Sequence, residues 1–225
     1  FLLPDDVVKA HDEGIIHFHD ADYFAQNVLT NCELINLDDM LQNGTVINGV
    51  KIEKPHRFLT ACTIATQIIL AVTSSTYGGA TVSLTHLAPF VRDSYNRYIT
   101  KYENAGLKPP QVEELAKEDL KKEISDAVQT MNYQLNSFTT TNGQSPFVSV
   151  CIYLNENPEY KREIALLAEE TFKQRIAGLK NRQGVPVTQA FPKILYVLDT
   201  NNCDESTEYW WLTELAAKCT AKRMV

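Results

Sequence analysis

The spacing of apolar residues predicts long helices separated by short strands. Between Thr60 and Ser75 the apolar side chains recur at helical spacing and form a single stripe along one face. The same reasoning, with helix-starting and helix-stopping residues, predicts further helices over Pro4–Gly14, Leu87–Asn104, Val112–Leu135, Pro158–Ile176 and Glu205–Cys219. Gly14 and Gly178 stand where two of these helices should stop, since glycine readily adopts the left-handed conformation that ends a helix.

Short apolar runs between the helices predict strands. They cover Ile15–His19, Cys32–Leu37, Phe147–Tyr153 and Ile194–Leu198, whereas 42–49 is rich in turn residues. Helices that alternate with short apolar strands are typical of an α/β fold with a parallel sheet, so we expect strands buried on both faces. No repeat or linker divides the chain, and we expect residues 1–225 to form a single domain.

Composition narrows the possible functions. The chain has 225 residues, of which 44% are hydrophobic and 22% charged, as expected for a globular domain with one sizeable core. A formal net charge of -7 argues against a surface that coats nucleic acid. No apolar run is long enough to predict a membrane span. Five widely spaced cysteines predict neither a disulfide framework nor a zinc ribbon, and indicate a reducing cytoplasm.

Two histidines form the first candidate site. His17 and His19 would point to the same side of a strand and together suit a metal ion. One alternative reading is therefore a zinc-dependent barrel hydrolase. Such a site needs further ligands, yet downstream the chain offers only His56 and His86, both near predicted helix starts. The other interpretation is that both histidines are hydrogen-bonded to carboxylates or to backbone, and no metal site is predicted.

The remaining candidates are weak when taken singly. Cys32 alone is most simply a small buried apolar residue of a strand. Cys219 stands at the end of a predicted helix, where the dipole raises a thiol pKa and disfavours a thiolate nucleophile. A thiol that reacts by losing a hydrogen atom needs no charge, so radical chemistry stays open there. Four further polar residues have the appearance of ordinary surface positions: Glu53, His56, Gln67 and Arg97.

Several segments together give a stronger signal than any one motif. They are Gly14–Asp20, Asn31–Ile35, Thr66–Ile69 with Tyr77–Gly79, Leu87–Val91, Asn142–Phe147, Arg175–Leu179, Ala190–Lys193 and Cys219–Met224. In order and spacing the chain resembles the large catalytic subunit of the anaerobic (class III) ribonucleoside-triphosphate reductases. The least familiar part is 100–122.

The resemblance implies part of a ten-stranded α/β barrel, the fold of ribonucleotide reductases and glycyl-radical enzymes, with long interface helices. Two cysteines meet inside such a barrel. Cys32 matches the one on a strand, which supplies a hydrogen to the substrate, and Cys219 matches the one on a finger loop, which relays the radical. His17 matches a histidine that faces the pocket. The implied reaction is the anaerobic reduction of ribonucleoside triphosphates to 2′-deoxyribonucleoside triphosphates by thiyl-radical chemistry.

The resemblance also implies allosteric control at a dimer interface. Glu53, His56, Gln67 and Arg97 match or lie near positions where a deoxynucleoside triphosphate effector binds and selects the substrate. Helices Thr60–Ser75 and Leu87–Asn104 would then form the interface of a homodimer. ATP is a further effector of the family.

Some family features have no counterpart in these 225 residues. They are the glycyl radical, which an activase with S-adenosylmethionine and an iron–sulfur cluster generates, the zinc-binding cysteine cluster beside it, and the N-terminal ATP-sensing region. We therefore expect this fragment to be inactive alone. A non-catalytic nucleotide-binding dimerisation module remains an alternative. A formate-lyase relative would carry adjacent paired cysteines, and Cys219 has no cysteine next to it.

Overall fold

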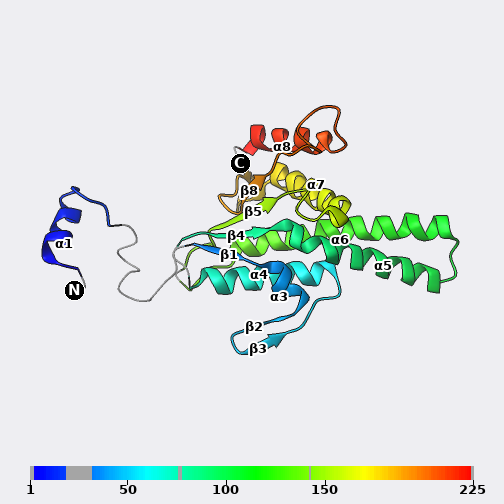
Figure 1. The fold of residues 1–225 in the computed structure, drawn as a ribbon, viewed down its shortest axis with the longest axis horizontal. Helices are drawn as coiled ribbons and strands as arrows, with labels where there is room; N and C mark the ends of the chain where they lie inside the picture. The colour runs from blue at the N-terminus through cyan, green and yellow to red at the C-terminus, as the bar shows by residue number, and fades with distance from the viewer. Residues whose placement is uncertain (1–2, 19–31, 76–77, 142, 224–225) are drawn as a thin grey trace.

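The computed structural model describes residues 3–18, 32–75, 78–141 and 143–223 (Figure 1). Its helices are α1 (Asp5–Asp12), α3 (Leu37–Gln42), α4 (Phe58–Thr73), α5 (Ala88–Asn104), α6 (Pro109–Ser137), α7 (Lys161–Ala177) and α8 (Trp210–Arg223), with 3-10 turns η1 (Leu84–Leu87) and η2 (Pro158–Tyr160). Its strands are β1 (Glu33–Ile35), β2 (Thr45–Ile47), β3 (Val50–Ile52), β4 (Ala80–Ser83), β5 (Val148–Ile152), β6 (Leu179–Lys180), β7 (Pro186–Val187) and β8 (Lys193–Tyr196).

The central sheet has four strands in the order β1-β4-β5-β8, and every neighbouring pair is parallel. Ile35, Val82, Val150 and Ile194 are paired across it in one row and pack into the hydrophobic core with the helices. The strands follow one another in chain order, and their helices cover one face. This arrangement differs from a doubly wound sheet, in which helices cover both faces. The α/β prediction is confirmed.

The other face of the sheet is open among the described residues. The neighbouring row consists of Leu34, Thr81, Ser149 and Lys193. None of these four is buried, and Leu34 is 82% exposed. The expectation of strands buried on both faces is therefore wrong for this structure, because helices cover only one of them.

Side chains from two neighbouring helices secure the start of α4. Phe58 N donates to Ser94 Oγ at 2.8 Å, and Leu59 N donates to Glu123 Oε1 at 3.2 Å. The first backbone N–H groups of a helix have no partner within the helix, and its positive dipole end favours a carboxylate. Ser94 from α5 and Glu123 from α6 thus replace a local cap, and they fix how the three helices pack.

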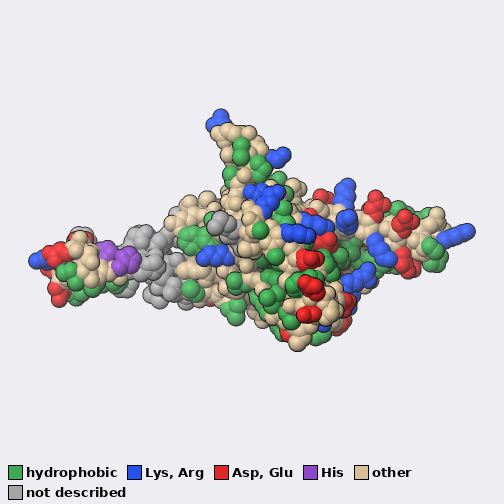
Figure 2. All heavy atoms as spheres, turned by 90° about the horizontal axis from the view of Figure 1, so that it is seen from above, with side chains coloured by type: hydrophobic (Ala, Val, Ile, Leu, Met, Phe, Trp, Pro, Cys, Tyr) green, Lys and Arg blue, Asp and Glu red, His purple; other side chains and the backbone are tan. Residues whose placement is uncertain are grey.

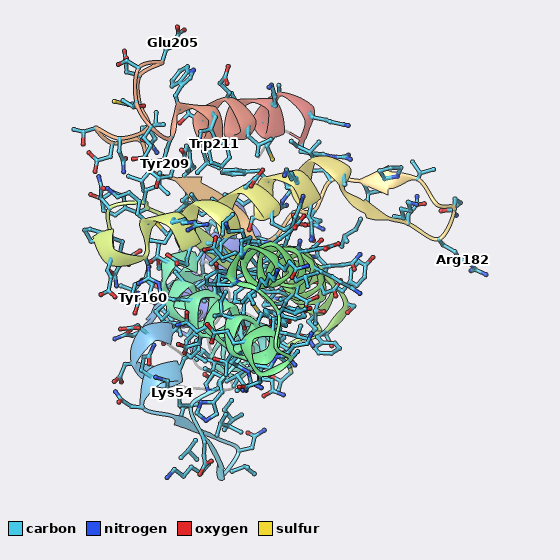
Figure 3. All side chains as sticks on the ribbon, turned by 90° about the vertical axis from the view of Figure 1, so that its right-hand side faces the viewer. Lys54, Tyr160, Arg182, Glu205, Tyr209 and Trp211 are labelled. Carbon is cyan, nitrogen blue, oxygen red and sulfur yellow. The ribbon has the colours of Figure 1, made fainter. Side chains whose placement is uncertain are left out.

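Two hairpins project from this body. In the first, Asn48 and Gly49 join β2 to β3 with φ angles of 50° and 78°, the left-handed pair that a tight two-residue turn requires. The second joins β6 to β7 and carries Arg182 at its tip, which Figure 3 shows pointing away from the body. The sequence indicated only turns in 42–49, and neither hairpin was predicted.

The first predicted strand is not formed. Residues 15–18 follow α1 without regular structure, and His19 lies outside the described residues. The preceding helix ends as predicted, with Gly14 at a φ of 73°. No helix of the described part is both long and apolar enough to cross a membrane.

Candidate active site and effector pocket

Cys32 lies immediately before β1, at the end of the sheet where the parallel strands begin. Glu33 N donates to Gly79 O at 3.0 Å, which fixes the register of this end against β4. Side chains two residues apart on a strand share a face, so Cys32 and the exposed Leu34 both belong to the open face. Cys32 is itself exposed. The Cys32 side chain therefore lies at the surface of this face.

Cys219 occupies a different environment. It lies within α8, is 2% exposed, and borders a cavity of about 40 Å³ with Phe172, Ile194 and Tyr196. Burial raises the pKa of the Cys219 thiol, and this outweighs the opposite effect of Arg175 and Arg223.

The cavity beside Cys219 is on the helix-covered side of the sheet, because Ile194 belongs to the row that faces the core. Cys32 belongs to the open face. The structure thus does not bring Cys32 and Cys219 together, and it places Cys219 on a packed helix rather than on a loop. Within the described residues the two thiols therefore do not meet, and their meeting in a complete barrel stays a prediction that this part of the chain does not test.

His17 lies beyond α1, and its ring centroid is 5.7 Å from that of His11. The imidazole is exposed, and no strand aligns it with the sheet within the described residues. The same part of the chain contains no group of three or more histidine, cysteine or acidic side chains placed to hold a metal ion. The alternative zinc pair is not tested, because His19 is outside this part.

A polar cluster that the sequence did not reveal lies where β4 and β5 end. The hydroxyls of Ser83 and Thr85 both donate to the Glu156 carboxylate, and His86 Nε2 lies 3.4 Å from its other oxygen. Cys151 faces the open side nearby, and burial together with Glu156 raises the pKa of its thiol. The carboxyl ends of parallel strands are a frequent place for binding sites. The one local signal was Glu156, a carboxylate that follows the predicted strand Phe147–Tyr153.

Of the four expected effector residues, Arg97 lines a pocket. The cavity has a volume of about 560 Å³ and lies between the start of α4 and the facing sides of α5 and α6. Glu53, His56 and Gln67 are exposed but are not among the residues that line it. The structure therefore does not gather the four residues within one chain.

Charges in this pocket are only partly paired. Lys101 Nζ lies 2.9 Å from Asp119 Oδ2, and Arg57 Nε lies 3.5 Å from the buried Glu123. Arg97 and Lys122 form no ion pair within 4.0 Å in the described part of the chain. These two cations are thus available to an anionic group, with Asp126 as the remaining carboxylate of the lining.

Comparison with known proteins decides the family. The family model described as anaerobic ribonucleoside-triphosphate reductase matches residues 1–225. The chain belongs to this family. It is 38% identical over 227 residues to the anaerobic ribonucleoside-triphosphate reductase of Escherichia coli K12, covering 99% of this chain and 30% of that protein. The reductase of Enterobacteria phage T4 is 32% identical over 226 residues, covering 99% of this chain and 36% of its own length.

The fold agrees with solved structures of the family. The anaerobic ribonucleotide reductase from Thermotoga maritima, in a crystal structure with dATP and CTP, superposes with a TM-score of 0.66 at 17% sequence identity, covering 97% of this chain and 36% of that one. A second structure of that enzyme, with dATP bound in the specificity site, gives a TM-score of 0.62. The chain thus spans about a third of its relatives, and family membership alone does not give the roles of its residues.

Proposed function

We propose that this chain forms part of the catalytic barrel of an enzyme that reduces ribonucleoside triphosphates to 2′-deoxyribonucleoside triphosphates under anaerobic conditions. The observation that carries the proposal is the position of Cys32. In a member of this reductase family, one thiol stands exposed on the open face of a parallel sheet whose other face is covered by helices. A ten-stranded barrel closed over that face would enclose the thiol.

Cys32 is the proposed hydrogen donor to the ribose. In the overall reaction the C2′–O bond breaks, the hydroxyl leaves as water, and a hydrogen takes its place. This two-electron reduction draws its electrons from formate or from a dithiol. Position is the main contribution of the protein, because the sulfur and the sugar carbon must approach closely and away from water. We propose His17 as a contact for the ribose hydroxyls or for the reductant.

The radical-relay thiol has to reach the same face as Cys32. Cys219 lies behind the sheet and is 2% exposed, so we propose that another part of the complete protein supplies this thiol. The family implies a glycyl radical, generated by an S-adenosylmethionine and iron–sulfur activase, which supplies the unpaired electron. An uncharged S–H on the open face suits such chemistry, because hydrogen-atom transfer requires no thiolate.

We further propose that Arg97 and Lys122 bind the phosphates of a deoxynucleoside triphosphate effector. Both cations line the pocket of about 560 Å³ and lack an ion pair in the described part of the chain. Glu53, His56 and Gln67 lie outside this pocket, so their contribution would come across the interface of a homodimer. The T. maritima relative with dATP in its specificity site supports an effector site of this kind.

The experiment that tests the function uses the complete protein with its activase, under anaerobic conditions, with formate or a dithiol. Formation of deoxyribonucleotide from CTP is expected, and Cys32→Ala is expected to abolish it while the circular dichroism spectrum is unchanged. Turnover by Cys32→Ala at the unmodified rate would overturn the proposed role of this thiol. A complete protein that binds nucleotides but forms no product would favour the alternative of a regulatory dimerisation module.

A further inference from the structure

A second cavity lies between α6 and α7, apart from the pocket of Arg97. Its volume is about 330 Å³. The α6 wall consists of Lys117, Leu120, Lys121 and Ile124, which recur at intervals of three and four residues and so share one face of the helix. We call this space the α6–α7 cleft.

The opposite wall comes from α7 and likewise combines apolar with charged side chains. Arg162, Leu166, Glu169 and Lys173 recur at helical spacing along it, and Tyr95 of α5 closes one side. Leu120 and Ile124 are nearly buried, whereas the lysines stand at the rim. The cleft therefore combines an apolar floor with a charged opening.

Polar contacts join α7 to the two helices beside it, α6 and α5. On one side Ser125 Oγ donates to Glu170 Oε1 at 2.8 Å and Gln174 Nε2 donates to Ser125 O at 2.9 Å, joining α6 to α7. On the other, Arg92 of α5 donates to both carboxylate oxygens of Glu163 at 3.0 and 2.9 Å. These contacts hold α7 against both α6 and α5 in the absence of a ligand, so the site is preformed. A preformed site avoids the cost of ordering its walls when a ligand binds.

The charge balance of the rim is positive. Lys117, Lys121, Arg162 and Lys173 face two carboxylates, Glu169 and Glu170, which leaves an excess of two positive charges. Lys173 Nζ is paired with Glu169 Oε1 at 2.6 Å, and Lys117 Nζ with Glu113 Oε2 at 3.2 Å outside the lining. Glu170 is engaged by Ser125 and Gln174. Lys121 and Arg162 have no ion pair within 4.0 Å among the residues that the structure describes. Figure 2 shows basic and acidic side chains intermingled over the right-hand part of the molecule, where Figure 1 places the far ends of α5 and α6.

We propose that the α6–α7 cleft binds a small aromatic anion, with a flat apolar ring on Leu120, Ile124 and Leu166 and a phosphate or carboxylate among Lys121 and Arg162. The volume is at the lower end of the roughly 300–1,000 Å³ of ligand pockets, which suits one ring system rather than a large ligand. Tyr95 offers the ring an aromatic neighbour. Neither Arg97 nor Cys32 lines the cleft, so the site is independent of the effector pocket and of the thiol chemistry.

The test titrates the complete protein with naphthyl phosphate and follows the fluorescence of the naphthyl ring. We expect saturable binding of one molecule per chain, with inorganic phosphate and naphthol each binding at least about tenfold more weakly, because each lacks half of the recognised chemistry. Lys121→Gln with Arg162→Gln is expected to weaken binding by about tenfold or more. The matched control, Lys180→Gln with Arg182→Gln, removes the same charge from exposed positions of the β6–β7 hairpin outside the cleft and should leave the affinity within about twofold.

A second variant tests the apolar half. Leu166→Trp fills the cleft, and its melting temperature shows independently whether the protein is folded. A folded Leu166→Trp protein should lose binding, whereas Arg97→Ala should retain it. The proposal is overturned if naphthyl phosphate fails to bind, if the Lys121 and Arg162 variant binds as tightly as the unmodified protein, or if the folded Leu166→Trp protein still binds.

Discussion

Cys32 and Cys219 lie on opposite sides of one parallel sheet, the first on its open face and the second on its helix-covered face. The row of residues that includes Ile194 faces the core beside Cys219. Cys32 is two residues before the exposed Leu34, so both side chains lie on the opposite face of the sheet. Two thiols that act on one substrate must reach the same space. This relationship therefore separates a proposed reacting thiol from a thiol that fills the core.

Replacing the core thiol should affect stability. We expect Cys219→Ala to lower the free energy of unfolding by about 1–2 kcal/mol, because it removes a buried atom from a packed helix, whereas the exposed Cys32→Ala should change it by less than about 0.5 kcal/mol. Urea denaturation of the complete protein measures both. Labelling with a thiol reagent provides a check, since Cys32 should react in the folded state and Cys219 only after unfolding. Rapid labelling of Cys219 in the folded protein would contradict its place in the core.

Gly178 allows α7, the β6–β7 hairpin and α8 to meet. It adopts a φ of 74°, and a Cβ there would lie 2.8 Å from Val187 O and 2.6 Å from Arg223 Nη2. The Arg223 guanidinium donates to Ile176 O at 2.8 Å and so satisfies a carbonyl at the end of α7. Gly178→Ala is therefore expected to cost about 1–3 kcal/mol.

The matched control for Gly178 is Gly184→Ala. Gly184 has a similar φ of 78° but nothing within 4 Å of its Cβ position, so this variant carries the conformational cost without the collision. Thermal melting of the two variants should show the larger loss for Gly178→Ala. Equal losses would mean that the close approach of Val187 and Arg223 contributes nothing.

Asp199 should make stability depend on pH in the acidic range. Hydrogen bonds from Asn155 Nδ2, Thr200 N and Tyr153 Oη lower the pKa of this carboxyl to about 2. A carboxylate whose pKa is lower in the folded state stabilises the fold above its unfolded value of about 3.9, and this stabilisation is lost as the pH falls towards the folded value. Asp199→Asn should thus be less stable than the unmodified protein at neutral pH, and the difference should shrink between about pH 4 and pH 2. Urea denaturation across this range measures it, and a difference that does not vary with pH would contradict the assignment.

Arg97 provides the test of the effector pocket. In the complete protein we expect Arg97→Ala to weaken dATP binding by about tenfold or more, in line with the loss of a charge-assisted contact to phosphate. Lys108→Ala, an exposed position that does not line the pocket, serves as the control. Calorimetric titration gives both affinities. Unchanged binding by Arg97→Ala would place the phosphates elsewhere.

Helices were predictable from the sequence because their signals are local. Apolar stripes and stop residues placed α4, α5, α6 and α7 within a few residues of their observed bounds, and Gly178 does end α7. The short strands were harder. β4 follows two glycines and alternates Ala80 and Val82 with hydroxyl side chains, a pattern too short to separate from a loop without its neighbours in the sheet.

The candidate site was only partly predictable, because the face of the sheet on which a side chain lies depends on packing between distant segments. Sequence identified Cys32 through a resemblance, and the register of β1 against β4 then placed it on the open face. For Cys219 the sequence indicated a helix end but not which side of the sheet the helix would cover. The cluster of Ser83, Thr85 and Glu156 joins segments about seventy residues apart, and no local pattern reveals such a contact.

The most direct test of the central claim compares product formation by Cys32→Ala and Cys219→Ala in the complete, activated protein under anaerobic conditions, at a temperature where both variants are folded. If Cys32 acts on the substrate and Cys219 does not, Cys32→Ala forms no deoxyribonucleotide from CTP, and Cys219→Ala retains turnover within a few-fold of the unmodified enzyme. Full turnover by Cys32→Ala, or complete loss with a folded Cys219→Ala, would contradict the account.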